Sequence, residues 1–228
     1  MVEGKFIAFE GVDGSGLTTQ AELLRGWFKR EQKECLVTKE PSELLIGGLI
    51  KETLAKRRIS LAEGTDLEHW LALLFAADRH DHLANVILPT LQKGIHVITD
   101  RYYLSSFAYQ GLAIDLESLR TMNARCRAPD LAIFLDVPVE ICKKRIERER
   151  WHTDLYEEAA KLQMVREKFF EAIERLTLEG ERIEMVNGND SPQAVHRSVV
   201  ALVRKLVNRN HAADVRQLPL DAAARSPV

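Results

Sequence analysis

The sequence contains only three cysteines among 228 residues, Cys35, Cys126 and Cys142. They are scattered and odd in number, so they offer neither a disulfide framework nor the paired spacing of a zinc site. Cysteine usage of this kind is typical of a reducing compartment. We therefore expect a cytoplasmic protein.

Long apolar runs and a strong excess of one charge are also missing. No window holds about 18 uninterrupted apolar residues, and the N-terminus lacks a basic region followed by an apolar run. This pattern predicts neither a membrane span nor a signal peptide. The formal net charge is −2, so no overall basic surface points to nucleic acid. We expect no nucleic acid and no membrane among the partners.

What the sequence does contain is an alternation of short apolar segments and longer amphipathic ones. Its 46% hydrophobic and 29% charged residues suit one globular domain with a sizeable core. Short apolar runs separated by helices predict a parallel sheet covered on both faces. The predicted strands are 5–10, 35–40, 95–99, 130–137 and 182–187. The predicted helices are 17–33, 43–57, 66–91, 103–110, 115–126, 139–149, 154–179 and 191–207.

The domain and its cleft follow from this alternation. Helical periodicity stops near Asn210, so we expect one domain over 1–209 and a flexible tail over 210–228. In a parallel sheet of this kind, ligands bind beyond the carboxyl ends of the strands. The segments predicted to surround one cleft are Gly11–Thr19, Lys39–Pro41, Asp100–Arg101 and Asn187–Asn189.

The stretch "GVDGSGLTT" follows the first predicted strand and precedes the first helix. It matches seven of the eight positions of the phosphate-loop pattern G-x-x-x-x-G-K-[ST], in which backbone N–H groups cradle phosphate and Thr18 offers a hydroxyl to magnesium. The alternative is a glycine-rich turn without a ligand. The candidate ATP-binding residues are Gly11, Val12, Asp13, Gly14, Ser15, Gly16, Leu17, Thr18 and Thr19.

The loop lacks its lysine, because Leu17 stands at that position. A hydrogen bond to a charged group contributes roughly 1.5–3 kcal/mol, and Leu17 forfeits it. The backbone cradle and Thr18 remain. Phosphate binding should therefore survive the change more readily than catalysis does.

Three further stretches carry candidate site residues. "LLFAADRHDH" places Phe75 and Arg79 one turn apart on a helix, where a ring and a guanidinium suit a planar base; periodicity alone favours a core Phe75 and a surface Arg79. In "DRYYLSSFAYQG", Asp100 can hold hydrated magnesium and Arg101 can bind phosphate; the alternative is a strand-end salt bridge. "KKRIERER" is either a phosphate-facing cluster or a solvated helix face.

Together these stretches resemble the thymidylate kinase family. "FEGVDGSG", "LLFAADR", "DRYYLSSFAYQG", "APDLAIFLDV" and the arginine-rich segment occur in the family's order over about residues 4–206. The resemblance implies an α/β, three-layer P-loop nucleoside monophosphate kinase fold with a five-stranded parallel sheet. It implies transfer of the ATP γ-phosphoryl group to dTMP with Mg²⁺, giving dTDP and ADP for dTTP biosynthesis, and commonly a homodimer.

The family's functional positions can be carried over residue by residue. Phe75 would stack on thymine, Arg79 would bind its carbonyl edge, and Tyr109 would favour deoxyribose. Asp13 would meet the 3′-hydroxyl, and Arg101 would bind the acceptor phosphate. The resulting dTMP-binding set is Asp13, Lys39, Phe75, Arg79, Arg101, Ser106, Tyr109 and Gln110. The magnesium set is Thr18 and Asp100. The catalytic set is Arg101 with Arg145, Arg148 and Arg150 of a lid at about 143–157.

Three departures from the family pattern bear on rate. Besides Leu17, the segment "KEPSE" offers Lys39 where the family often has a phosphate-binding arginine. The lid reads Asp154-Leu155-Tyr156-Glu157, without its usual arginine. Because phosphoryl transfer needs positive charge without regard to its origin, we expect the loop to bind ATP and the lid arginines with Arg101 to supply charge. The alternatives are a catalytically impaired nucleotide-binding protein and a kinase for another nucleoside monophosphate.

Overall fold

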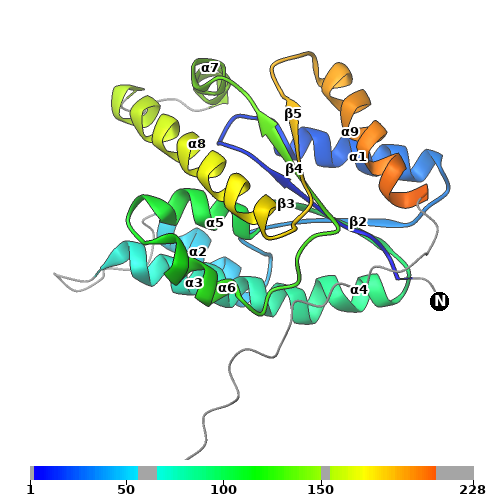
Figure 1. The fold of residues 1–228 in the computed structure, drawn as a ribbon, viewed down its shortest axis with the longest axis horizontal. Helices are drawn as coiled ribbons and strands as arrows, with labels where there is room; N and C mark the ends of the chain where they lie inside the picture. Colours follow the sequence, from blue (N-terminus) through cyan, green and yellow to red (C-terminus); the bar gives the residue numbers. More distant parts are fainter. Residues whose placement is uncertain (1–2, 56–65, 150–154, 209–228) are drawn as a thin grey trace, which may run out of the picture.

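A five-stranded parallel sheet forms the centre of the protein. The computed structural model describes residues 3–55, 66–149 and 155–208, without the side chains of 148–149 and 155–158. The sheet order is β2-β3-β1-β4-β5 (Figure 1), as the predicted fold requires. The strands are β1 (Phe6–Glu10), β2 (Cys35–Lys39), β3 (His96–Asp100), β4 (Leu131–Asp136) and β5 (Ile183–Asn187).

Alternating side chains of the central strand β1 build two separate cores. Phe6 and Ala8 point into one hydrophobic cluster, while Ile7 and Phe9 point into another, because successive side chains of a strand face opposite sides. The helices α1 (Leu17–Arg30) and α9 (Pro192–Asn208) cover the Ile7 face. The Phe6 face is covered by α3 (Leu67–His82), α5 (Tyr103–Tyr109), α6 (Leu116–Asn123) and α8 (Leu155–Leu178) (Figure 1). The result is the predicted three-layer arrangement.

The remaining helices are α2 (Leu45–Leu54), α4 (Leu88–Gln92) and α7 (Val139–Glu149), with a 3₁₀ turn over Gln110–Leu112. The long helix predicted over 66–91 is present as one continuous helical stretch from Leu67 to Gln92, in which Leu83–Ile87 forms a π-helical turn that the sequence did not predict. Pro89 lies two residues after this turn and has no N–H to donate to the carbonyl of Asn85, so the regular bonding cannot continue there. Among the described helices, none combines the length and the apolar character that a bilayer crossing requires.

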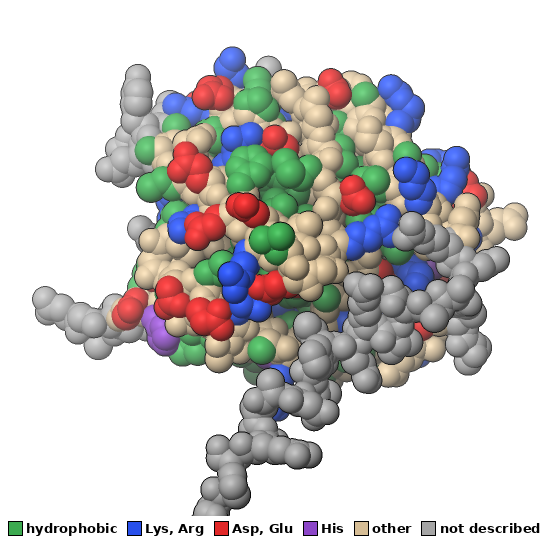
Figure 2. Space-filling model, viewed as in Figure 1, with side chains coloured by type: hydrophobic (Ala, Val, Ile, Leu, Met, Phe, Trp, Pro, Cys, Tyr) green, Lys and Arg blue, Asp and Glu red, His purple; other side chains and the backbone are tan. Residues whose placement is uncertain are grey.

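The strand register brings the expected loops to one edge. Phe9 of β1 and Lys39 of β2 both pair with Asp100 of β3, and Glu10 pairs with Phe134 of β4. The carboxyl ends of the strands are therefore level, and the segments that follow them meet. On the face seen in Figure 2, basic and acidic side chains are interspersed among the residues drawn in colour.

Candidate active site

The loop between β1 and α1 has the backbone of a phosphate cradle. Gly14 and Gly16 have φ angles of 80° and 96°, a region that favours glycine. Gly16 caps α1 without a side-chain hydrogen bond, so the first N–H groups of the helix have no side-chain acceptor at that position. Free N–H groups and the positive end of the helix dipole attract an anion there.

Leu17 does not face the cradle. Its side chain is 5% exposed and belongs to the core cluster that contains Ile7, Phe9 and Ala21. The first residue of α1 therefore serves the packing of the helix on the sheet. At this position the chain contributes apolar contact and no cation.

Arg145, from α7, lies on the loop instead. Its Nη1 donates to the carbonyl oxygens of Gly14 and Ser15, both at 3.2 Å, and its Nη2 donates to the carbonyl of Gly188 at 3.3 Å. The same Nη1 is 3.9 Å from the position that a Cβ of Gly16 would occupy. A guanidinium is thus fixed beside the lysine-less loop.

Gly14 explains how α7 comes so close. A Cβ on Gly14 would lie 2.6 Å from the carbonyl oxygen of Cys142, which is far inside van der Waals contact. Only glycine permits this approach of the loop to the helix that carries Arg145. The close packing of α7 on the loop therefore requires glycine at position 14, and the same packing places Arg145 beside the loop.

Thr18 and Asp100 meet at the mouth of the loop. The Thr18 hydroxyl donates to Asp100 Oδ2 at 2.5 Å. A hydroxyl and a carboxylate are the hard oxygen donors that Mg²⁺ prefers, and Mg²⁺ commonly takes only one or two protein ligands and completes its shell with water and phosphate. The pair fits that ion. Asp100 does not form the strand-end salt bridge with Arg101 that was the alternative.

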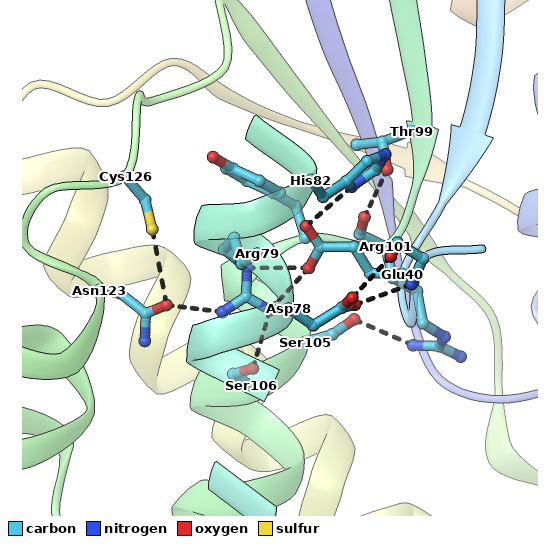
Figure 3. Close-up of polar contacts among 12 residues, drawn as sticks. Glu40, Asp78, Arg79, His82, Thr99, Arg101, Ser105, Ser106, Asn123 and Cys126 are labelled. Carbon is cyan, nitrogen blue, oxygen red and sulfur yellow. Dashed lines mark hydrogen bonds and ion pairs between the residues drawn. The ribbon is translucent and has the colours of Figure 1, made fainter. Parts of the chain in front are cut away.

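Arg101 occupies a strained position directly after β3. Its φ angle is 74°, in the left-handed region that costs a side-chain-bearing residue about 1 kcal/mol or more. Its Nη1 donates to the carbonyl of Gly11 at 2.9 Å and to the Ser105 hydroxyl at 3.0 Å, and its Nη2 donates to Asp13 Oδ1 at 2.7 Å. The guanidinium therefore bridges the phosphate loop and α5; Figure 3 shows the contact with Ser105 of α5.

Asp13, Arg101 and Tyr109 form one group. The Arg101 guanidinium lies 5.2 Å from the centre of the Tyr109 ring, and the N–H of Asp13 donates to the Tyr109 hydroxyl oxygen at 3.0 Å. Burial raises the pKa of the Tyr109 hydroxyl to about 12, so it is a neutral hydrogen-bonding group at physiological pH. Three residues assigned from two separate motifs are therefore in contact.

Arg79 is completely buried, with 1% of its surface exposed. Its Nε donates to Glu40 Oε2 at 2.8 Å, its Nη1 to Asn123 Oδ1 at 2.6 Å and its Nη2 to the Ser106 hydroxyl at 3.0 Å (Figure 3). Nη2 also lies 2.8 Å from Glu40 Oε2. Four of the five guanidinium N–H groups thus face acceptors within the described residues, which leaves one on Nη1. The expectation from periodicity of a surface Arg79 is wrong.

Further polar groups hold Glu40 and the helix of Arg79 in place. Glu40 Oε1 faces His82 Nδ1 at 3.4 Å, and His82 Nε2 lies 2.7 Å from the Thr38 hydroxyl. Asp78 accepts from the N–H of Ser42 at 2.7 Å and from its hydroxyl at 2.6 Å. Burial lowers the pKa of the Arg79 guanidinium, but Glu40, Cys126 and Tyr102 together outweigh this effect and the pKa is raised overall. Arg79 therefore stays charged in the interior.

The other predicted residues are less closely joined to this group. Lys39 forms an ion pair with Glu43 at 2.9 Å, so its ammonium is already engaged. Phe75 is half-buried one turn before Arg79, and Gln110 is buried. Arg148 lies in α7, its side chain outside the described part, while Arg150 and Asp154 lie wholly outside the described residues, as do 56–57 and the tail 210–228. The predicted lid at 143–157 can therefore be placed only at its two ends.

Sequence reasoning missed the residues that hold the two arginines. Glu40 and Asn123 hold Arg79 from 39 and 44 positions away, and Ser105 contacts Arg101 from the helix that follows. A buried carboxyl or amide carries no periodic signal that distinguishes it from a surface one. The only signal that the sequence offers is a charged residue at the end of an apolar strand, such as Glu10 in "KFIAFE" or Glu40 in "CLVTKE".

The geometry defines a class of protein. A parallel sheet of order β2-β3-β1-β4-β5 carries a phosphate loop at the end of its central strand, with an aspartate and an arginine at the end of the neighbouring strand. This combination is that of a P-loop nucleoside monophosphate kinase.

Comparison with known proteins identifies the family. The family model for thymidylate kinase matches residues 9–199. A "Probable thymidylate kinase" of Pyrococcus abyssi is 40% identical over 206 residues, which cover 89% of this chain and 97% of the relative. A "Thymidylate kinase" of Nitrosomonas eutropha is 34% identical over 215 residues, 90% of this chain and 94% of the relative. The chain belongs to the thymidylate kinase family.

Proposed function

We propose that the protein transfers the γ-phosphoryl group of ATP to dTMP, giving ADP and dTDP, and so serves dTTP biosynthesis. Its membership of the thymidylate kinase family supports the reaction. The contact of Asp13, Arg101 and Tyr109 beside the phosphate loop supports the position of the acceptor nucleotide. Phosphoryl transfer depends chiefly on positioning and on positive charge around the transferring group.

The thymine base is assigned to Phe75, Arg79 and Ser106. One N–H on Nη1 of Arg79 has no acceptor among the described residues and would donate to a base carbonyl, because the other four N–H groups face protein acceptors. Phe75 lies one helical turn away on the same face and would stack on the base. Tyr109 and the adjacent Gln110 would line the sugar, where a ring leaves little space for a 2′-hydroxyl.

The phosphates are assigned to the loop and Arg101. The N–H groups of Gly14 and of Gly16–Thr19 would hold the ATP phosphates, whereas the N–H of Ser15 donates to the carbonyl of Val12. Arg101 would bind the acceptor phosphate in place of its present contact with Asp13. Thr18 and Asp100 would hold Mg²⁺, which neutralises charge on the transferring phosphates when bound. Asp13, released from Arg101, would accept from the 3′-hydroxyl. Lys39 would reach the acceptor phosphate only by leaving Glu43.

The position of Arg145 is the observation that supports catalytic activity in a loop that has Leu17 in place of lysine. Its guanidinium lies 3.2 Å from two carbonyl oxygens of the loop and 3.9 Å from the Cβ position of Gly16. A positive charge fixed there acts on the same region as a loop lysine. We assign Arg145 as the main substitute for the lysine, with Arg148 and Arg150 completing the lid at about 143–157.

One assay tests the reaction against its alternatives. ADP release is measured with ATP–Mg²⁺ and a panel of dTMP, dUMP, AMP, CMP and GMP. We expect dTMP to be the preferred acceptor and dUMP to follow closely, because one methyl group in an apolar pocket contributes only about 1–3 kcal/mol. A preference for AMP or CMP would contradict the base site. ATP binding without turnover on any acceptor would favour a catalytically impaired nucleotide-binding protein.

Exposed leucines on two packed helices support a homodimeric assembly. Helix α2 packs on α3, and both expose leucines: Leu45 is 88% exposed, Leu49 40% and Leu73 48%. This apolar surface supports a homodimer, which light scattering would test; a Leu45→Glu, Leu49→Glu variant should be monomeric.

Cys35, Cys126 and Cys142 are free thiols, which supports a cytoplasmic location.

A further inference from the structure

Glu10 is a buried carboxyl that none of the assignments above uses. It ends β1, directly before the phosphate loop, and only 1% of its surface is exposed. Desolvation by burial raises its pKa to about 8, although Ser105, Arg101 and Arg79 all oppose this rise. Burying a carboxyl group costs free energy unless hydrogen bonds compensate for it, so the contacts of Glu10 indicate a role beyond packing.

The two oxygens of Glu10 hold Arg101 from both sides. Oε1 accepts from the backbone N–H of Tyr102 at 3.0 Å, which fixes the peptide that follows the strained Arg101. Oε2 lies 2.5 Å from the Ser105 hydroxyl, which in turn accepts from Arg101 Nη1 at 3.0 Å. One carboxyl thus restrains the backbone of Arg101 directly and its guanidinium through Ser105, the contact drawn in Figure 3.

The rest of the surroundings leaves Arg101 dependent on this restraint. Its N–H donates to the carbonyl of Phe9 at 2.9 Å, and its carbonyl accepts from the Thr99 hydroxyl at 2.8 Å. These contacts hold the main chain alone. The other contacts of the guanidinium are the carbonyl of Gly11, the face of the Tyr109 ring at 5.2 Å and the exposed Asp13, and Asp13 is the partner that dTMP would replace. Ser105 is therefore the side chain whose hydrogen bond to the guanidinium stays in place when the nucleotide binds.

We propose that Glu10 is a positioning residue for the acceptor phosphate: through Ser105 and the Tyr102 N–H it aims the Arg101 guanidinium at the phosphate of dTMP. The inference rests on the proposed function, in which Arg101 binds that phosphate. It extends the site to a second layer, meaning residues such as Glu10 that hold the ligand-binding side chains in place and do not touch the ligand themselves. It also gives the strained backbone of Arg101 a purpose, because a residue with an ordinary φ angle would direct its side chain elsewhere.

The test compares dTMP with thymidine, which carries the same base and sugar but no phosphate. Calorimetric titration of the full chain gives both dissociation constants, and their ratio isolates the contribution of the phosphate. Glu10→Met keeps the volume and removes both hydrogen bonds. We expect it to weaken dTMP binding about tenfold, the lower end for a lost charge-assisted contact. Thymidine binding should change less than about twofold.

Three companion variants make the result specific. Ser105→Ala breaks the link and keeps Glu10, so it should reproduce the selective loss even if Glu10→Met folds poorly. Glu10→Gln keeps an acceptor for the Tyr102 N–H and replaces the acceptor of the Ser105 hydroxyl with an amide N–H that can donate to the same oxygen, so it should restore most of the phosphate contribution. Glu181→Met is the matched control, because Glu181 is another carboxyl with a burial-raised pKa that bonds a hydroxyl of α5, that of Tyr103 at 2.6 Å; it should leave the ratio unchanged.

Each contrary result has a separate meaning. Equal losses for dTMP and thymidine in Glu10→Met and Ser105→Ala would show that Glu10 only supports the fold, and would overturn the proposal. A preference for dTMP that survives both variants, or a Glu10→Gln variant no better than Glu10→Met, would overturn it as well. If the unchanged protein bound thymidine as tightly as dTMP, Arg101 would not be the phosphate ligand, and the proposed function would fall together with the inference.

Discussion

The Nη1 atom of Arg145 lies 3.2 Å from the carbonyl oxygen of Ser15, inside the loop that has Leu17 in place of a lysine. In the usual phosphate loop this position supplies a lysine that reaches the phosphates. Leu17 packs the first turn of α1 on the sheet, and Arg145 brings a cation from α7. If Arg145 supplies the charge of the missing lysine, as proposed, activity depends on the docking of α7.

Arg145→Ala should lower turnover strongly while leaving dTMP binding nearly unchanged. An arginine delivered to a transferring phosphate contributes about 10³–10⁵ in rate, and we expect a loss in the lower part of that range. Arg148→Ala and Arg150→Ala measure how the lid shares the charge, and Lys144→Ala at an exposed neighbouring position is the control. Steady-state ADP release gives the turnover numbers. A turnover of Arg145→Ala equal to that of Lys144→Ala would contradict the assignment.

Leu17→Lys should partly rescue Arg145→Ala and help the unchanged protein much less, because both cations act on the same developing charge. The double-mutant cycle on turnover measures this coupling. The substitution also removes a 5%-exposed apolar side chain from the core, so the variant should unfold at lower urea concentration than Leu17→Met. Strict additivity, with the same gain from lysine in both backgrounds, would show that Arg145 does not replace it.

Gly14→Ala should reduce ATP affinity and turnover together. Its Cβ would lie 2.6 Å from the carbonyl of Cys142, at a φ angle of 80°, so either the loop or α7 must move. We expect at least a tenfold rise in the dissociation constant for ATP, by analogy with the strain of about 1–3 kcal/mol at such positions. Gly48→Ala is the control: a Cβ on Gly48 in α2 meets nothing within 4 Å, so that variant should bind ATP normally and gain up to about 1 kcal/mol of stability. Normal ATP binding by Gly14→Ala would contradict the steric account.

Glu40→Gln should destabilise the protein by about 3–5 kcal/mol, because it leaves the buried Arg79 without its anionic partner. Glu43→Gln, three residues along, is the matched control. Glu43 is an exposed carboxylate whose pKa Lys51 and Lys39 lower to about 2, and exposed ion pairs contribute only about 0–1 kcal/mol. Urea denaturation measures both variants. Equal losses of stability would mean that the Arg79–Glu40 pair contributes no more than a surface contact.

The stability of the protein should fall as the pH rises from 5 to 8. Glu10 has a pKa of about 8 in the folded protein against an ordinary 4.5, so the folded state keeps a proton that the unfolded chain has released. Its stabilising effect is complete below pH 4.5 and is lost as the pH rises through 8, with a slope of at most about 1.4 kcal/mol per pH unit. Urea denaturation at several pH values should show this slope, and Glu10→Gln should flatten it. An unchanged slope in the variant would assign the effect to other groups.

Much of the fold could be predicted because its signals are local. Apolar runs such as "KFIAFE" and "DLAIFLDV" correspond to β1 and β4 within one or two residues, and the spacing of glycines marks the loop. The π-helical turn at Leu83–Ile87 was not predicted, since the apolar stripe continues through it and the effect of Pro89 on the bonding of the preceding turn is invisible to periodicity. The resemblance supplied the positions of the site residues, whose roles remain predictions.

The second layer of the site could not be predicted. Burial of Arg79 depends on Glu40 and Asn123, which other loops and helices bring to it. Periodicity assigns each residue to a face of its own helix and says nothing of a partner about 40 positions away. The inward position of Leu17 is equally a property of the packed helix and sheet, whereas the sequence alone shows only that a lysine is missing.

The left-handed backbone of Arg101 also has an evolutionary consequence. Glycine at this position would relax the main chain by about 1 kcal/mol, while it would remove the guanidinium that the site needs. Selection for folding stability alone should therefore favour glycine at position 101, whereas selection for growth should favour arginine. In a mutant library sorted for resistance to proteolysis, Arg101→Gly should become enriched over Arg101→Ala, and both should disappear from a library that must sustain thymidine nucleotide synthesis.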